Sequence, residues 1–240
     1  MYEPRFYRSK MQAKGLVSFE VIVKETDLHI SASKNLALLA RKAVLQYRAD
    51  IEGFIAKQPI FATTFSPYEV PNEAPEIIKE MAKATACVGV GPMASVAGAV
   101  AQFVGKDLLR ESTEVIVENG GDIFLKTKRK RRMGIYAGNS SLSNKVALMI
   151  HPEETPLGVC TSSATVGHST SLGCADAVVA VSKNTLLADA AATAIGNRIK
   201  NVNDIGKAIA FAQSLDGIAG VVIIKDDKLG VCGELELTNL

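Results

Sequence analysis

Two runs of strand-forming residues, separated by adjacent glycines, constrain the middle of this chain. Residues 113–125 read TEVIVENGGDIFL; the β-branched, aromatic and aliphatic residues suit a buried sheet, whereas Gly120 and Gly121 weaken a strand. Paired glycines allow a β-bulge or a tight hairpin turn. They also let another molecule lie against the backbone, where the Asn119 amide and the Asp122 carboxylate could face a ligand or a metal. Both interpretations stay open at this point.

Size and charge narrow the class of protein. A chain of 240 residues can form one large domain or two small ones, and either can bury a substantial core. The net charge of +2 and the absence of Trp give no reason to expect a nucleic acid or a membrane as partner. No apolar run is long enough for a membrane helix, and residues 1–12 are too polar for a signal peptide, so we expect a cytoplasmic protein. The four cysteines form no CxxC pair, which argues against disulfides and structural zinc and predicts reduced, mostly buried thiols.

Apolar periodicity predicts an α+β fold in which antiparallel strands and long helices are segregated. Ser33 and Asn184 are the expected N-caps of two of the helices. Helices are predicted over 36–55, 75–88, 94–104, 184–200 and 203–215, and strands over 16–23, 28–30, 113–118, 122–127, 133–136, 145–150, 158–161, 175–181, 218–225 and 229–234. We expect a single domain over 1–240, with sub-structure at 1–110 and 111–240.

Residues 89–105 (GVGPMASVAGAVAQFVG) are rich in small side chains. Gly91 and Pro92 break the chain, and residues 94–104 suit a tightly packed helix. Small side chains permit close approach, either of a second helix or of an anionic ligand over the helix N-terminus, where unpaired N–H groups favour anions.

Asp189 and Thr193 lie four residues apart on a predicted helix whose other residues are nearly all small or apolar. This spacing places their oxygens on one face, with the Cβ atoms about 5–6 Å apart. A carboxylate in apolar surroundings is costly unless it is paired or bound to a metal, and these oxygens suit Mg²⁺ or Ca²⁺. Alternatively, Thr193 bonds back to the backbone and Asp189 caps a neighbouring loop.

Residues 159–168 (VCTSSATVGH) and the stretch that follows contain the residue types of nucleophile–base pairs. Cys160, His168 and Cys174 are therefore candidate catalytic residues. No G-x-S-x-G elbow is present, and a polar loop with a buried cysteine is the alternative.

The strongest charge feature is residues 126–132 (KTKRKRR), with six cations in seven residues between Lys126 and Arg132. It lies between two predicted strands, so we expect a solvated hairpin tip. The alternative is a clamp for an anionic ligand or an acidic protein partner. Since no aromatic residues interleave for base stacking, the run is a weak indication of nucleic-acid binding.

The order and spacing of these motifs resemble the ApbE family, the magnesium-dependent FAD:protein FMN transferases. The similar segments are residues 91–105, 119–122 (NGGD), 161–162 (TS) and 188–194 (ADAAATA). The resemblance implies a T-fold-related α+β fold with antiparallel sheets and long packed helices, and Mg²⁺ held by Asp189 and Thr193. It also implies an FAD- or FMN-facing surface formed by Gly91, Asn119, Gly120, Gly121, Asp122, Thr161 and Ser162.

The chain is most similar to a shorter branch of these proteins, found mainly in anaerobic bacteria and archaea. It lacks the HIIDP-x-TG element of ApbE proteins and has only Gly167, His168 and Ser169 in that region. The leading expectation is Mg²⁺-dependent binding of a flavin or a nucleotide-diphosphate-like ligand, with FMN or phosphoryl transfer. The alternatives are a persulfide carrier in sulfur assimilation and a non-catalytic scaffold that binds an acidic partner. Exposed apolar helices are compatible with a homodimer.

Overall fold

A β-hairpin and a long helix open the chain. The computed structural model describes Arg8 and residues 13–165 and 172–240. Strand β1 (Val17–Val23) pairs with β2 (Thr26–Ala32), and α1 (Ala37–Lys57) packs against β1. The prediction that Ser33 caps this helix was wrong, because the Ser33 N–H and hydroxyl both bond to the Ser112 hydroxyl.

The other predicted helices and strands appear in the predicted order, and the Asn184 side chain caps α5 as expected. The remaining helices are α2 (Ile60–Thr63), α3 (Glu76–Ala86), η2 (Pro92–Ser95), α4 (Val96–Leu108), η3 (Pro152–Glu154), α5 (Thr185–Gly196), η4 (Val202–Asp204) and α6 (Ile205–Gln213). The remaining strands are β3 (Val115–Asn119), β4 (Asp122–Lys126), β5 (Arg131–Gly134), β6 (Val146–Ile150), β7 (Leu157–Ser162), β8 (Ala177–Ser182), β9 (Ile218–Lys225), β10 (Lys228–Gly233) and β11 (Glu236–Asn239).

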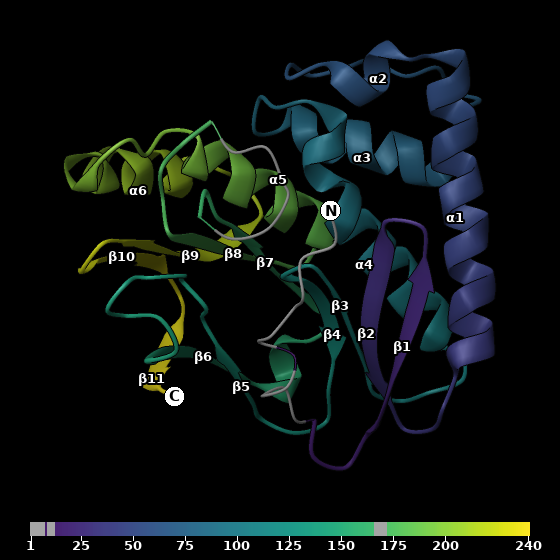
Figure 1. Cartoon of the computed structure of the whole chain (residues 1–240), viewed down its shortest axis with the longest axis horizontal. Helices are drawn as coiled ribbons and strands as arrows, with labels where there is room; N and C mark the ends of the chain where they lie inside the picture. The colour runs from purple at the N-terminus through teal and green to yellow at the C-terminus, as the bar shows by residue number, and fades with distance from the viewer. Residues whose placement is uncertain (1–7, 9–12, 166–171) are drawn as a thin grey trace.

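All strand pairs of the described chain are antiparallel, and they form two sheets (Figure 1). The large sheet has the order β1-β2-β3-β4-β7-β8-β9-β10, and the small sheet has the order β11-β6-β5. The α+β prediction with antiparallel sheets is confirmed. Pairing of β2 with β3 places segments from both sides of residue 110 in one sheet. Strand β11 was not predicted, because it is four residues long and Leu237 is its one apolar residue.

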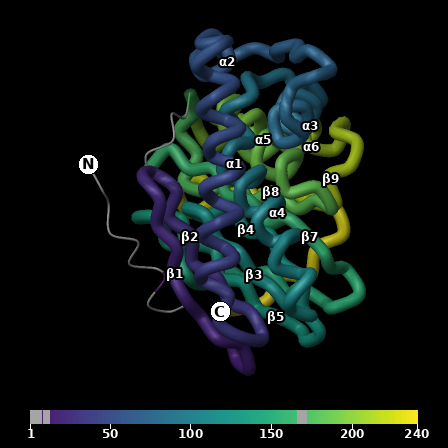
Figure 2. The backbone as a smooth tube through the Cα atoms, turned by 90° about the vertical axis from the view of Figure 1, so that its right-hand side faces the viewer, coloured from purple at the N-terminus to yellow at the C-terminus, as the bar shows by residue number. Residues whose placement is uncertain are grey.

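Helices cover one face of the large sheet, and the small sheet packs on the other. Helix α4 contacts β3 and β4, α5 contacts β7 and β8, and α6 contacts β9 and β10. Helix α1 belongs to the same helical layer and contacts both β1 and α4; Figure 2 shows it nearest the viewer. On the opposite face, Val159 and Val222 of the large sheet belong to a core that includes Leu148 and Ile150 of β6. Within the described ranges, no helix has the length and apolar character needed to cross a membrane.

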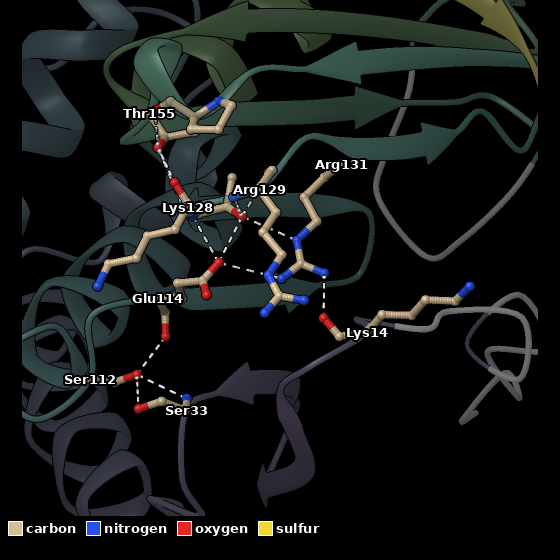
Figure 3. A network of polar contacts seen from close by, with 10 residues as sticks. Lys14, Ser33, Ser112, Glu114, Lys128, Arg129, Arg131 and Thr155 are labelled. Carbon is tan, nitrogen blue, oxygen red and sulfur yellow. Dashed lines mark hydrogen bonds and ion pairs between the residues drawn. The ribbon is translucent and has the colours of Figure 1, made fainter.

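The basic segment 126–132 connects the two sheets. Strand β4 ends at Lys126 in the large sheet, and β5 begins at Arg131 in the small one, so the prediction of a hairpin tip was wrong. The Glu114 carboxylate holds this connection, as Figure 3 shows: it accepts from the Thr127 hydroxyl at 3.0 Å and from the Lys128 N–H at 2.8 Å, and it pairs with Arg131 at 3.4 Å. The exposed cations of the segment are Lys128, Arg129, Lys130 and Arg132.

Replacing Glu114 with glutamine is expected to lower the free energy of unfolding by about 1–3 kcal/mol at pH 7, since it removes charge-assisted hydrogen bonds. Burial alone would raise the pKa of Glu114, but the Lys128 N–H, the Thr127 hydroxyl and Arg131 outweigh it and hold the pKa below its ordinary value. The stabilisation is therefore present above the unfolded pKa of about 4.3 and is lost as the pH falls further. Urea denaturation at pH 7 and pH 3.5 measures both effects.

The matched control is Glu111→Gln, which removes an exposed ion pair with Lys34 and should change the free energy of unfolding by less than about 1 kcal/mol. Equal effects of the two substitutions at pH 7 would show that the Glu114 network does not hold the two sheets together.

Candidate functional site

Gly120 and Gly121 form the turn of a hairpin between β3 and β4. Asn119 and Asp122 pair across the turn, and the glycines have φ angles of 70° and 103°, in the region that favours glycine. Of the two structural interpretations of this segment, the tight hairpin is therefore confirmed. The ligand-facing role implied by the resemblance stays a prediction.

Buried polar side chains hold the end of this hairpin. The Asn119 Nδ2 donates to the carbonyl of Ala97 in α4 at 3.2 Å, and the Gly121 N–H donates to Oε1 of Glu118 at 3.0 Å. The Asn119 amide thus fixes the turn to the first turn of α4. Asp122 begins β4, which contacts α5.

Asp189 of α5 serves as the cap of α4. Its Oδ2 accepts a hydrogen bond from the N–H of Gly98 at 2.8 Å, in the first turn of α4. The residue at the N-cap position, Ser95, instead donates its hydroxyl to the carbonyl of Pro92. The N-terminus of α4 therefore receives its anion from the protein itself, and Asp189 caps a helix, not a loop as the alternative to metal binding had it. Metal binding by Asp189 stays a prediction.

Gly98 makes this contact geometrically possible. A Cβ atom on Gly98 would lie 2.6 Å from the Thr185 carbonyl oxygen and 2.9 Å from the Asp189 Cβ. The small residues of α4 thus allow close packing against α5, one of the two uses that the sequence left open.

Asp122 and Asp189 form a buried carboxylate pair in which the pKa of each group is raised above its ordinary value. Burial, and then the charge of Asp189, raise the pKa of Asp122 well above its usual range. Burial also raises the pKa of Asp189 to about 7, although the N–H groups of Gly98 and Ala97 oppose the shift. Near neutral pH, the pair therefore holds a proton more readily than two exposed carboxylates would.

Cys160 lies opposite Asp122 in the pairing of β4 with β7 and is fully buried. Its Sγ is 3.4 Å from the Thr185 carbonyl, to which it donates. Burial and the charges of Asp122 and Asp189 raise the pKa of this thiol well above its usual range. The expectation of a reactive Cys160 is therefore corrected, because a nucleophile needs an accessible thiolate.

The other two candidate catalytic residues do not join this cluster. Cys174 is exposed beyond the C-terminal end of α5, where its N–H donates to the Ile199 carbonyl. His168 lies outside the described residues. All four cysteines are free and within the described ranges, and since only Cys160 is buried, the expectation of mostly buried thiols was wrong.

The other residues predicted to bind a ligand or a metal lie in different surroundings. Thr161 borders the glycine turn, since a Cβ on Gly121 would lie 3.8 Å from the Thr161 Cβ. Ser162 lies beside Gly196 at the end of α5, and Thr193 is half-buried one turn after Asp189. Gly91 is buried against the backbone of Thr64, whose carbonyl oxygen would be 1.9 Å from an added Cβ. That contact explains why Gly91 has no side chain.

The donor set at the carboxylate pair suits a hard divalent cation. The buried Oδ1 of Asp122 has no hydrogen-bond partner among the described residues. A cation between the two carboxylates would supply this partner and offset their mutual repulsion, and the Thr193 hydroxyl is the same kind of ligand. No cluster of three or more His, Cys, Asp or Glu within residues 13–165 and 172–240 could hold a metal. Any further ligands would therefore be hydroxyl, carbonyl, water or phosphate oxygens.

Sequence relatives cover most of the chain. The family model described as AbpE bacteria matches residues 8–225. A UPF0280 protein of Methanocaldococcus jannaschii is 41% identical over 221 residues, which cover 90% of each chain. A UPF0280 protein of Methanococcus maripaludis is 40% identical over 222 residues, again with 90% of each chain covered.

Solved structures show the same fold at low sequence identity. The flavin transferase ApbE from Vibrio cholerae superposes with a TM-score of 0.61 and 14% identity, over 90% of this chain and 96% of that one. The Pseudomonas stutzeri flavinyl transferase ApbE, in its apo form, gives a TM-score of 0.58 and 14% identity, over 90% and 94%. These likenesses confirm the predicted ApbE-like fold. Its sequence and its fold together show that the chain belongs to the AbpE bacteria family.

Proposed function

We propose that this protein binds a flavin nucleotide, or another ligand with a nucleotide diphosphate, together with Mg²⁺ at the Asp122–Asp189 carboxylate pair. The observation that carries the proposal is the buried, unpartnered Oδ1 of Asp122 beside a second carboxylate. The fold shared with the flavin transferase ApbE of Vibrio cholerae and the flavinyl transferase ApbE of Pseudomonas stutzeri supports the choice of ligand.

Asp122, Asp189 and Thr193 would hold the cation, which when bound neutralises phosphate charge and polarises the bond to be cut. The N-terminus of α4 is filled by Asp189, so phosphates would meet the protein through this metal site instead of through the helix N–H groups. Gly121 has no side chain to prevent close approach to the backbone of the turn, and the Cβ and carbonyl oxygen of Thr161 border it. The reaction class that fits is FMN or phosphoryl transfer.

Titration with FAD tests the proposal. In the presence of Mg²⁺, the wild type is expected to quench flavin fluorescence and to show a thermal shift, and both effects should disappear with EDTA. Asp189→Asn should lose most of the Mg²⁺-dependent binding, because the amide keeps an acceptor for Gly98 but carries no charge. Asp204→Asn is the matched control, since Asp204 also accepts from two backbone N–H groups, those of Lys200 and Asn201, but on a different helix. No binding by the wild type, or equal binding by Asp189→Asn, would overturn the proposal.

The two alternative functions have less support. Cys160 is a poor candidate for a persulfide carrier, because its thiol is buried and the pKa of the thiol is raised. An acidic protein partner at the exposed cations of residues 126–132 stays a prediction, as does a homodimer.

A further inference from the structure

The Arg8 side chain is buried on the face of the large sheet opposite the helices. Its Nε donates to Oε2 of Glu118 at 2.6 Å, its Nη1 donates to Oδ1 of Asp27 at 2.6 Å, and its Nη2 donates to the Asp27 carbonyl at 2.8 Å. The Arg8 side chain is 8% exposed and that of Glu118 is 1% exposed. Glu118 shares its face of β3 with Ile116, which packs toward the small sheet. The guanidinium therefore joins β2 to β3 in a desolvated ion pair of fixed geometry.

Glu118 links Arg8 to the glycine turn through hydrogen bonds to both. One carboxylate oxygen accepts from Arg8, and the other accepts the N–H of Gly121 at 3.0 Å. Because a carboxylate is planar, fixing one oxygen aims the other. Gly121 directly precedes Asp122 and has a φ of 103°. By holding the Gly121 N–H, Glu118 therefore restrains the backbone that sets the direction of the Asp122 side chain.

We propose that Arg8 is a positioning residue for the carboxylate pair. Arg8 fixes Glu118, Glu118 fixes the N–H of Gly121, and the restrained turn keeps Asp122 beside Asp189 in the geometry that receives a cation. Groups that orient metal ligands from behind typically change metal affinity 10- to 100-fold when they are removed. The cation part rests on the proposed function, whereas the coupling from Arg8 to Gly121 does not.

The test uses the ¹⁵N-labelled chain of 240 residues, with Mg²⁺ alone as the probe. In Arg8→Gln, the Gly121 amide should exchange with solvent faster than in the wild type, measured by NMR without metal. The Kd for Mg²⁺, measured by titration of the same sample, should rise about tenfold or more. Arg8→Lys keeps the charge but loses the forked donor geometry, so its Gly121 exchange rate and its Mg²⁺ Kd should lie between those of the wild type and Arg8→Gln. If Arg8→Gln does not fold, Arg8→Lys alone is compared with the wild type.

Arg48→Gln is the matched control. Arg48 is also a partly buried arginine in a network, with Glu25, Glu52 and Thr26, but it contacts no residue of the turn. Its loss should lower the melting temperature and leave Gly121 exchange and the Mg²⁺ Kd unchanged.

The outcomes separate the two proposals. Unchanged Gly121 exchange in the Arg8 variants overturns the coupling, whatever happens to Mg²⁺. Faster exchange with an unchanged Mg²⁺ Kd overturns the positioning role. A wild type that binds no Mg²⁺ overturns the proposed function and the cation part of this inference, while Gly121 exchange still decides whether Arg8 controls the turn.

Discussion

In metal-free buffer at pH 8, the Asp189→Asn variant is expected to melt at a higher temperature than the wild type, and below about pH 4 the two should melt alike. Burial raises the pKa of Asp189 to about 7, so at pH 8 the native state holds a charged carboxylate that the amide avoids. Against an unfolded pKa of about 3.9, this costs at most about 4 kcal/mol, and less where water reaches the side chain. We expect a gain of about 1–3 kcal/mol, or roughly 5 °C for a chain of this size.

The sign follows from linkage. Because the folded pKa lies above the unfolded one, the native state binds the proton more tightly. The stability that this proton provides is complete below about pH 4 and is lost as the pH rises to about 7. Thermal melts at pH 3.5, 5, 6, 7 and 8 in EDTA should therefore show the two proteins diverging above about pH 4. Asparagine keeps an acceptor for the Gly98 N–H, so the cap of α4 is retained.

Asp204→Asn should behave in the opposite way. Its backbone donors, first the N–H of Lys200 and then that of Asn201, hold the pKa of Asp204 below its ordinary value, so the charged form stabilises the native state. Its replacement should lower the melting temperature at both pH 5 and pH 8. If Asp189→Asn also melted lower at pH 8, Asp189 would be a stabilising charged cap and not a strained one.

Added Mg²⁺ should reverse the order at pH 8. A cation that replaces the proton between the carboxylates stabilises the wild type by mass action, and the Asp189→Asn variant should gain little. A functional carboxylate that costs stability until its ligand binds is a common trade-off at active sites.

The regular elements of this fold were predictable because each carries its own periodicity. Helix α3 shows an apolar stripe with Pro75 before it, and β8 is a continuous buried run. Ser33 and β11 could not be predicted in the same way. The partner of Ser33 is Ser112, which is distant in the sequence, and β11 depends on pairing with β6 and carries almost no pattern of its own.

The candidate site was predictable only in part, for the same reason. Asp189 could be singled out because a carboxylate in apolar surroundings is costly and so needs an explanation, and Asp122 because it follows the two glycines that interrupt a strand. Their supports could not be found from local pattern. Gly98 bonds to Asp189 across 91 residues, and Arg8 bonds to Glu118 across 110. Gly98 was one small residue among many in its helix, and nothing in the sequence around Arg8 marked it.

Replacing Gly98 with alanine is expected to destabilise the protein by at least about 2 kcal/mol, although alanine favours a helix over glycine by about 1 kcal/mol. The added Cβ would lie 2.6 Å from the Thr185 carbonyl oxygen and 3.2 Å from Oδ2 of Asp189. Since a backbone carbonyl cannot rotate away as a side chain can, α4 and α5 must separate. The separation also lengthens the hydrogen bond from residue 98 to Asp189, so the thermal shift with Mg²⁺ should shrink.

Gly53→Ala separates this clash from the effect of helix propensity. Gly53 is also a glycine within a helix, α1, but it is exposed and an added Cβ would meet nothing within 4 Å. Its replacement should stabilise the protein by about 0.5–1 kcal/mol, because glycine loses more backbone freedom on folding. Urea denaturation of both variants should thus give shifts of opposite sign. If Gly98→Ala were also stabilising, α4 and α5 would not be packed closely enough for Asp189 to cap α4, and the carboxylate pair would lose the contact that holds one of its members in place.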